Sequence, residues 1–326
     1  MPLIHGHRKD AQRPIWGHDQ LIWYLLYRKP QFRMHPAMST PTAPAKINLF
    51  LHVGSPRADG YHPIESLVAF ASCGDDLRFT RGGDAFTIEV DGPFAIAAGD
   101  PGSNLVLKAA SALKRKVPGI GGGAFQLTKN LPAGAGLGGG SSDAAAALRL
   151  LAHDNDLATD DPTLREAARE TGADVLVCLD RKARLVSGIG DVLSEPIVLP
   201  CLHAVLVWPA SAASTPAVYR AFDEAEIKRS TAFGIRTDDI PRERDSLLRF
   251  IARQSNDLTR AAWHVTPRVA EADAALRAID RAILVRMSGS GSTVFAIYET
   301  MDIAEQEAVA VRAKYPDWWV KAVTLS

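Results

Sequence analysis

A dense run of glycine, followed by two serines and an alanine-rich segment, gives the clearest chemical signal in the sequence. Glycine loses more conformational freedom on folding than any other residue, so such a run needs a compensating use. The usual one is close approach of backbone N–H groups to a phosphate at the start of a helix. The run predicts a cradle for a triphosphate. Its residues are Pro132, Ala133, Gly134, Ala135, Gly136, Leu137, Gly138, Gly139, Gly140, Ser141 and Ser142.

Two better-known phosphate loops fit this run poorly. Its glycines at 134, 136 and 139 match the spacing of dinucleotide-binding folds, but there an apolar strand runs straight into the first glycine. Here Pro132 breaks the strand, and a long strand-rich segment comes first. The P-loop of nucleoside triphosphatases needs a lysine after the glycines, and none follows here. A cradle of a third kind is therefore expected, and an NAD-binding oxidoreductase is disfavoured.

Two charged residues stand out by their sequence context. Lys46 lies inside an otherwise apolar stretch, and Asp174 follows Gly172 and precedes the apolar run 175–179. Taken alone, the context favours a solvated strand lysine at position 46. It leaves Asp174 open between a turn or capping carboxylate and a functional one.

Strands and helices must position these residues, and their order predicts an α+β protein in two domains, 38–199 and 200–326. In the first domain, Gly74-Asp75 and Gly82-Gly83 predict breaks between short strands, and residues 173–180 are predicted to be extended. The predicted strands before the loop are 46–53, 67–72, 76–80, 86–90 and 123–132. The predicted helices, with their expected caps, are 103–117 (Ser103 or Asn104), 141–154 (Ser141 or Ser142) and 161–172 (Asp161).

The pattern restarts near residue 200 with a second set of elements, in which the turn 288–292 joins two strands. The predicted strands are 202–208, 282–287, 293–300 and 318–325. The predicted helices are 215–225, 266–279 and 303–315.

Composition and charge narrow the classes of function. The 326 residues carry a formal net charge of +0, so no global field points to nucleic acid or to an acidic membrane. No apolar run approaches the length of a membrane span. The 3 cysteines have neither metal-ligand spacing nor a disulfide pattern, which favours a cytoplasmic protein. Nothing in the sequence sets the oligomeric state.

Residues 1–37 show neither the helical nor the strand periodicity of apolar residues. They mix histidine, arginine and tryptophan, and their apolar run 21–27 is too short for a membrane helix. We interpret residues 1–37 as a disordered extension, or as the result of a start placed upstream of Met38.

Three motifs together resemble the GHMP kinase superfamily of small-molecule kinases. "LPAGAGLGGGSSDAAAAL" is similar to its signature loop, and "PAKINLFLHVGSPRADGYH" and "MSGSGSTVFAIY" look like its first and third motifs. Together with "ETGADVLVCL", they resemble the branch that phosphorylates a cytidine diphosphate derivative of methylerythritol, a precursor of isoprenoids made without mevalonate. The resemblance runs from about Pro44 to the C-terminus. It implies a two-domain fold with an N-terminal α/β nucleotide-binding domain and a C-terminal ferredoxin-like domain.

The resemblance also assigns roles to individual residues. It implies that ATP and Mg²⁺ are used, that the glycine loop holds ATP, and that Lys46 and Asp174 form the catalytic pair. Ser141 or Ser142 is a candidate Mg²⁺ ligand, although no acidic cage is visible. The sequence departs from the family at Leu176 and Cys178, where proline and an aromatic residue are common; the carboxylate itself is kept.

The substrate end is also implied by the resemblance. It assigns Tyr61 and His62 to the cytidine group, places Asn48 near the acceptor, and puts Thr215 and Tyr219 on the other side of the base. Tyr219 as a core residue and His62 as a turn residue remain alternatives. The predicted reaction is phosphorylation of the 2-hydroxyl of the cytidine-linked substrate. A homoserine or mevalonate type of GHMP kinase, or a catalytically silent nucleotide-binding protein, is the alternative.

Overall fold

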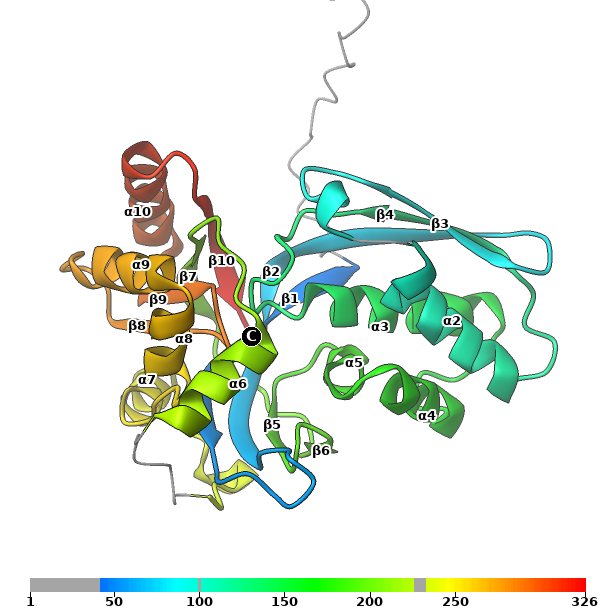
Figure 1. Cartoon of the computed structure of the whole chain (residues 1–326), viewed down its shortest axis with the longest axis horizontal. Coiled ribbons are helices and arrows are strands. Elements are labelled where there is room, and N and C mark those ends of the chain that lie inside the picture. The colour runs from blue at the N-terminus through cyan, green and yellow to red at the C-terminus, as the bar shows by residue number, and fades with distance from the viewer. Residues whose placement is uncertain (1–41, 99–100, 226–232) are drawn as a thin grey trace, which may run out of the picture. The chain divides into compact units, whose positions relative to one another are not determined.

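The computed structural model describes residues 42–98, 101–225 and 233–326 (Figure 1). The interpretation of residues 1–37 therefore lies outside the described residues. Within these three ranges, every helix falls short of the length and apolar character that a membrane span needs.

Ten strands among the described residues form one connected sheet system. The strands are β1 (Ala43–Val53), β2 (Ile64–Arg81), β3 (Phe86–Asp91), β4 (Gly123–Thr128), β5 (Arg184–Ser187), β6 (Val192–Leu193), β7 (Leu202–Trp208), β8 (Leu284–Met287), β9 (Val294–Tyr298) and β10 (Trp319–Leu325). The main path runs β3-β4-β2-β10-β7-β9-β8, and β1 and β5 pair with β2 beside it. Because β2 pairs with β1, β4, β5 and β10, it is the central element of the molecule.

The strand β2 corrects the prediction of two short strands at 67–72 and 76–80. It is one strand of 18 residues that continues through Gly74 and Asp75. A Cβ at Gly74 would lie 2.3 Å from the carbonyl oxygen of Ala43 on β1. Glycine therefore serves close approach of two backbones here, not a turn, and sequence alone does not distinguish these two uses.

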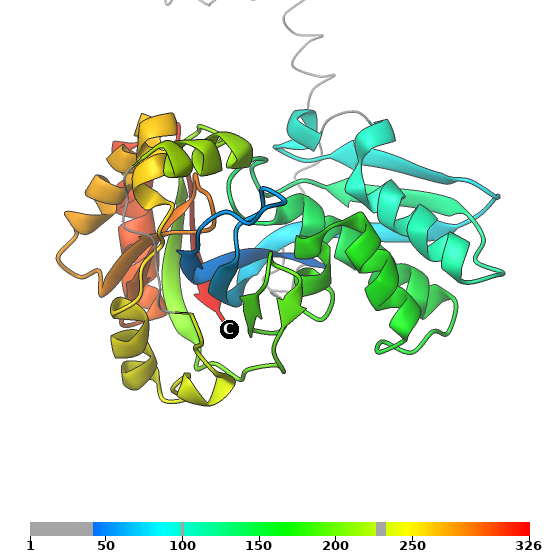
Figure 2. The ribbon, with the colours of Figure 1, turned by 60° about the horizontal axis from the view of Figure 1, so that its bottom comes forward.

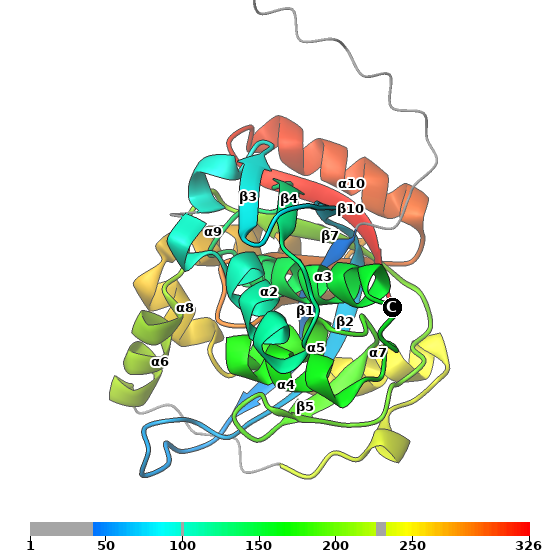
Figure 3. The same ribbon diagram turned by 90° about the vertical axis from the view of Figure 1, so that its right-hand side faces the viewer.

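Four helices cover one face of the N-terminal part of the sheet. They are α2 (Leu105–Lys116), α3 (Gly139–Asp154), α4 (Pro162–Thr171) and α5 (Ala173–Cys178), and Figure 3 shows them in front of β1 and β2. The side chains of Asn104 and Asp161 cap α2 and α4, as predicted. Small residues on α3, such as Ala144 and Ala147, are fully buried and let this helix pack closely in the core.

The C-terminal part has the ferredoxin-like order. After β7 come α6 (Thr215–Glu224), α7 (Arg244–Ala252), α8 (Thr259–Val265) and α9 (Pro267–Arg277), and α10 (Met301–Lys314) lies between β9 and β10. The sheet order β10-β7-β9-β8 is antiparallel throughout. This is the split β-α-β pattern. The helix α7 was not predicted.

The predicted boundary between residues 199 and 200 falls just before β7. The sheet crosses this boundary, because Leu325 of β10 pairs with Ala71 of β2, and the end of β10 lies beside β2 (Figures 1 and 2). The division into domains 38–199 and 200–326 stays a prediction.

Candidate active site

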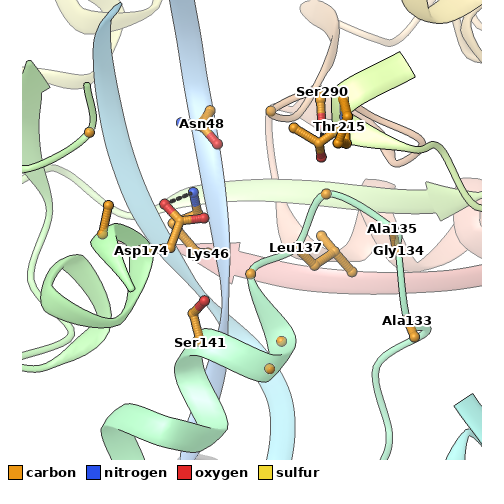
Figure 4. A pocket seen from close by; sticks show the side chains of 18 of the residues that line it. Lys46, Asn48, Ala133, Gly134, Ala135, Leu137, Ser141, Asp174, Thr215 and Ser290 are labelled. Atoms are coloured by element: carbon orange, nitrogen blue, oxygen red, sulfur yellow. Dashed lines mark hydrogen bonds and ion pairs between the residues drawn. The ribbon is translucent and has the colours of Figure 1, made fainter. Parts of the chain in front are cut away.

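A cavity of about 1030 Å³ brings together residues that are far apart in the sequence. The glycine loop, β1, the start of α5, α6 and the turn after β8 all contribute to its wall (Figure 4). The residues singled out from the sequence that line it are Lys46, Asn48, Tyr61, His62, Pro132, Ala133, Gly134, Ala135, Gly136, Leu137, Gly138, Gly139, Gly140, Ser141, Asp174, Thr215 and Tyr219.

The glycine loop owes its shape to three residues with positive φ. Gly134, Gly136 and Gly138 have φ of 64°, 73° and 62°, which only glycine adopts readily. A Cβ at Gly136 would lie 2.6 Å from the carbonyl oxygen of Gly291. The loop therefore needs glycine both for its turns and for its contact with the segment after β8.

The helix α3 begins at Gly139 with Gly138 as its N-cap, and no side chain caps it. The prediction that Ser141 or Ser142 is the cap is wrong, because the helix starts two residues earlier. The first N–H groups of a helix have no partner within it. Here, without a capping side chain, they are available to an anion, and the helix dipole favours negative charge at the same end.

The two serines after the glycines differ in environment. Ser141 lines the cavity, and Figure 4 shows it at the start of α3. Ser142 is fully buried: its hydroxyl donates to the carbonyl of Pro44 (2.8 Å) and its N–H donates to the carbonyl of Gly138 (2.8 Å). The expected contact of Ser142 with a nucleotide or Mg²⁺ therefore does not fit this geometry, because both of its donors are used inside the protein.

Lys46 and Asp174 form an ion pair at one wall of the cavity (Figure 4). Lys46 Nζ lies 3.0 Å from Asp174 Oδ1; the lysine side chain is 9% exposed and the aspartate side chain 50%. Burial lowers the pKa of Lys46, but attraction to Asp174 and to Cys178, with the hydrogen bond to Asp174, raises it above its ordinary value. Lys46 thus stays charged, and Asp174 keeps part of its carboxylate open to the cavity.

Asp174 reaches this place because residues 173–178 form the helix α5. The prediction of extended structure at 173–180 is wrong in this part. A short continuous apolar run does not distinguish a buried strand from a buried helix. Leu176 and Cys178, which depart from the family pattern, are both buried in the core. The departure therefore affects packing and leaves the carboxylate in the cavity.

Asn48 is held on β1 by two serines. Its side-chain Nδ2 donates to Ser66 Oγ (2.7 Å), and its backbone N–H donates to Ser288 Oγ (3.1 Å). Its Oδ1 is buried and has no hydrogen-bond partner among the described residues. Buried polar atoms are nearly always satisfied. Asn48 lines the cavity, but this oxygen is itself covered, with Gly289 close by, so a ligand would bond to it only after the side chain turns.

Aromatic side chains gather at another wall of the cavity. The rings of His62 and Tyr219 lie 5.0 Å apart, and His62 Nε2 is 2.9 Å from Asp223 Oδ1. Burial, with a smaller contribution from Asp174, raises the pKa of Tyr219 to about 12, so its hydroxyl stays neutral. Tyr61 is 60% exposed. Tyr219 both packs against the C-terminal core and lines the cavity, so the two interpretations of it are compatible.

The turn after β8 closes the cavity from the other side. Gly289 and Ser290 line it, and Ser290 Oγ lies 2.7 Å from Thr215 Oγ1. Gly291 is not part of the wall; it packs behind Gly136 instead. The turn meets the glycine loop through the close approach of Gly291 to Gly136 and through Ser288 Oγ, which donates to the carbonyl of Gly136 (3.2 Å).

The sequence analysis missed a buried ionic cluster under the glycine loop. Lys129 donates to Asp143 Oδ2 (2.7 Å) and to Asp75, and Asp75 Oδ1 accepts from the N–H groups of Asn130 (2.6 Å) and Leu131 (2.8 Å). This cluster fixes the segment that leads into the loop. Asp143 lies near the start of α3, where an acidic residue is common, and no periodic signal in the sequence marks Lys129 as buried.

Comparison with known proteins finds a matching family model in each of the two parts of the chain. Residues 104–181 match the model "GHMP kinases N terminal domain" and residues 243–317 match "GHMP kinases C terminal". A 4-diphosphocytidyl-2-C-methyl-D-erythritol kinase of Methylorubrum extorquens is 47% identical over 288 residues, which cover 88% of this chain and 99% of the relative. That of Xanthobacter autotrophicus is 48% identical, over 87% of this chain and 97% of the relative.

Solved structures agree with this result. A crystal structure of 4-(cytidine 5'-diphospho)-2C-methyl-D-erythritol kinase is 35% identical with a TM-score of 0.68, covering 87% of this chain and 98% of the other. The mevalonate kinase of L. major is 17% identical with a TM-score of 0.62, covering 87% and 94%. The second likeness concerns the fold alone.

Proposed function

This chain belongs to the 4-diphosphocytidyl-2-C-methyl-D-erythritol kinases, a family of GHMP kinases, and from this we propose that it transfers the γ-phosphoryl group of ATP to the 2-hydroxyl of 4-(cytidine 5'-diphospho)-2-C-methyl-D-erythritol. The predicted GHMP kinase fold and family are confirmed. The observation that carries the proposal is one cavity in which the glycine loop, the Lys46–Asp174 pair and the His62–Tyr219 wall all meet.

ATP is proposed to lie with its phosphates on the glycine loop. The uncapped start of α3 offers N–H donors and the positive end of a helix dipole, which suit a triphosphate. The segment 289–290 lies against the loop at Gly136 and also lines the cavity, so it is proposed to add a second set of backbone contacts. These features fix the direction in which the γ-phosphate points, and positioning supplies much of the rate in phosphoryl transfer.

Asp174 is proposed as the base for the attacking hydroxyl. The oxygen of that hydroxyl forms a bond to the γ-phosphorus while the bond from this phosphorus to the leaving oxygen of ADP breaks, and the proton passes to the Asp174 carboxylate. Lys46, charged and 3.0 Å from Asp174, orients this carboxylate and offers positive charge beside the reacting oxygens.

Mg²⁺ is expected with the nucleotide, and the cavity fits an ion held mainly by phosphates. The described residues contain no group of three or more histidine, cysteine or acidic side chains that would hold a metal ion by themselves. Mg²⁺ often keeps several waters and few protein ligands. Ser141, on the cavity wall, is the proposed protein ligand. When bound, the ion would neutralise part of the negative charge on the phosphates.

The His62–Tyr219 wall is proposed to hold the cytosine ring, with Tyr61 on the exposed side. Stacking on an aromatic ring is worth about 1–3 kcal/mol per base in nucleic-acid systems. Asn48, with its unpartnered Oδ1, is proposed to bind the erythritol part between the base and the catalytic pair. Binding of the remote cytidine then helps to place the hydroxyl. We further place the reaction in the cytoplasm, in agreement with three unpaired cysteines.

One coupled experiment separates this function from its rivals. The protein is incubated with ATP and the cytidine-linked substrate, and phosphorus NMR follows formation of a phosphomonoester. Cytidine diphosphate is expected to compete with the sugar substrate and not with ATP. Phosphorylation of homoserine or mevalonate without inhibition by cytidine diphosphate would refute the proposed substrate. Binding of ATP without any transfer would favour a silent nucleotide-binding protein.

A further inference from the structure

One arginine on α3 bonds to both elements that carry the catalytic pair. Arg149 Nη1 donates to the carbonyl oxygens of Cys178 (2.9 Å) and Leu179 (3.0 Å), at the end of α5. Arg149 Nη2 donates to the carbonyl oxygen of Thr42, immediately before β1. A single rigid guanidinium thus joins two backbone segments that lie more than a hundred residues apart in the sequence.

The two segments are the supports of Lys46 and Asp174. Lys46 follows Thr42 by four residues on β1, about 13 Å at the rise of an extended strand. Asp174 precedes Cys178 by four residues on α5, about 6 Å at the rise of a helix. The pairing register of β1 shifts between Pro44 and Lys46, whereas the support of Asp174 is one short regular helix. A shift at the bonded end of α5 therefore moves the Asp174 side chain relative to Lys46.

The helix α5 depends on such a contact more than the other helices near the site. It has six residues, and its N-cap Gly172 offers no side-chain hydrogen bond. A helix of this length has little stability of its own, and its orientation is set by tertiary contacts. Donors at its C-terminal carbonyls satisfy groups that the helix leaves open, and a positive charge is favourable there.

The acceptors of Arg149 are carbonyl groups. Burial, followed by repulsion from Arg181, lowers the pKa of Arg149 to about 10, so the guanidinium is still charged at neutral pH. Its fork of donors reaches three carbonyls at once, which the single ammonium of lysine does not match in geometry.

We propose that Arg149 is a positioning residue that sets the separation and angle of the Lys46–Asp174 pair by bracing β1 against α5. The proposal rests on the catalytic roles proposed above for those two residues. It differs from a purely structural role, in which Arg149 would stabilise the fold without affecting the rate of the folded enzyme.

The test compares Arg149→Lys and Arg149→Gln with Arg244→Lys. Arg244 is a matched control because its Nη2 also donates to two successive carbonyls, those of Tyr298 (3.0 Å) and Glu299 (3.1 Å), far from the pair in the sequence and outside the cavity wall. All three variants are expected to lose some melting temperature. Only the Arg149 variants are expected to lose kcat, by about ten- to a hundredfold, because misplacement of about 1 Å has such effects. The KM values for ATP and for the cytidine-linked substrate should change less than about twofold.

A double-mutant cycle with Asp174→Asn gives the decisive readout. If Arg149 acts through the position of Asp174, Arg149→Lys should lower kcat much less in the Asp174→Asn background than in the wild type. Long incubations keep the slow turnover measurable. An equal factor in both backgrounds, or unchanged kcat in folded Arg149→Lys and Arg149→Gln, would overturn the inference. If Asp174→Asn alone keeps wild-type turnover, the proposed catalytic role has failed instead.

Discussion

Replacement of Asp174 by asparagine separates the catalytic contribution of the carboxylate from its contribution to stability. Asparagine has nearly the same shape, and its Oδ1 still accepts a hydrogen bond from Lys46 Nζ, which lies 3.0 Å from the carboxylate in the wild type. The change therefore removes the negative charge and the ability to accept the proton. Binding of ATP on the glycine loop should be unaffected.

The structure sets different magnitudes for the two losses. The Asp174 side chain is 50% exposed but the Lys46 side chain only 9%, so solvent screens one partner alone, and loss of the carboxylate charge costs about 1–2 kcal/mol. A loss of that size lowers the melting temperature by about 2–8 °C in a protein of roughly this size. Loss of a general base lowers kcat on the order of 10²–10⁴-fold, or about 3–5 kcal/mol of barrier. The rate should thus collapse while the fold persists.

The assay measures kcat by coupled ADP release, ATP affinity by calorimetry and unfolding by scanning calorimetry. Asp317→Asn is the matched control, because Asp317 is 55% exposed and also pairs with an arginine, Arg268. Because both partners of this pair are exposed, the control should show a smaller loss of melting temperature and wild-type turnover. If Asp174→Asn keeps kcat within about threefold of the wild type, Asp174 serves only as the structural partner of Lys46, and the base must be sought elsewhere.

Three further substitutions test the glycine loop, the His62–Tyr219 wall and the buried ionic cluster of Lys129, Asp75 and Asp143. Gly138→Ala should lower the free energy of unfolding by about 1–2 kcal/mol and weaken ATP binding, because φ is 62° and the new Cβ would lie 3.1 Å from Lys46 Cε. The control is Gly82→Ala, where the new Cβ would meet open space. Equal effects in the two variants would refute the interpretation. Tyr219→Ala should raise KM for the cytidine-linked substrate about tenfold or more at unchanged KM for ATP, and a rise in both would contradict the assignment. Burial raises the pKa of Asp143 from 3.8 to about 8, so the folded state keeps a proton that the unfolded chain releases. Relative to Asp143→Asn, the wild type should therefore lose stability as pH rises from about 4 towards about 8, and parallel urea-unfolding curves across this range would show that the carboxyl is ionised in the fold.

Local signals in the sequence were sufficient where one residue type has one dominant use. Asp161, and either Ser103 or Asn104, were predicted as caps because short polar side chains suit that position; Asp161 and Asn104 cap their helices. The glycine loop was predicted from its own residues, whereas the Lys46–Asp174 pair was implied only by the resemblance to the family; the fold brings both to one cavity. Their roles stay predictions until the variants are measured.

The sequence was insufficient where tertiary contact decides between two uses of the same residue. A glycine such as Gly74 is typical of turns, but in the fold it permits β1 and β2 to approach closely. Residues 173–178 have the composition of a buried strand but form a helix. Lys129 and Asp75 are charged residues that usually lie on the surface, yet they pair beneath the loop. None of these outcomes follows from neighbours along the chain.

The pairing of β2 with β10 has a consequence for how the protein is made. Ser72 Oγ accepts from the N–H of Thr324, a contact across 252 residues, and Phe70 exchanges two backbone hydrogen bonds with Ser326. At about 5–20 residues per second, a ribosome needs roughly 10–50 s between synthesis of these two strands. During that time this edge of β2 stays open to pairing with other chains. Limited proteolysis of ribosome-bound chains that stop before β10 should find β2 accessible, and protection there would contradict this order of events. Pairing of β10 with β2 therefore closes an edge through which nascent chains can aggregate.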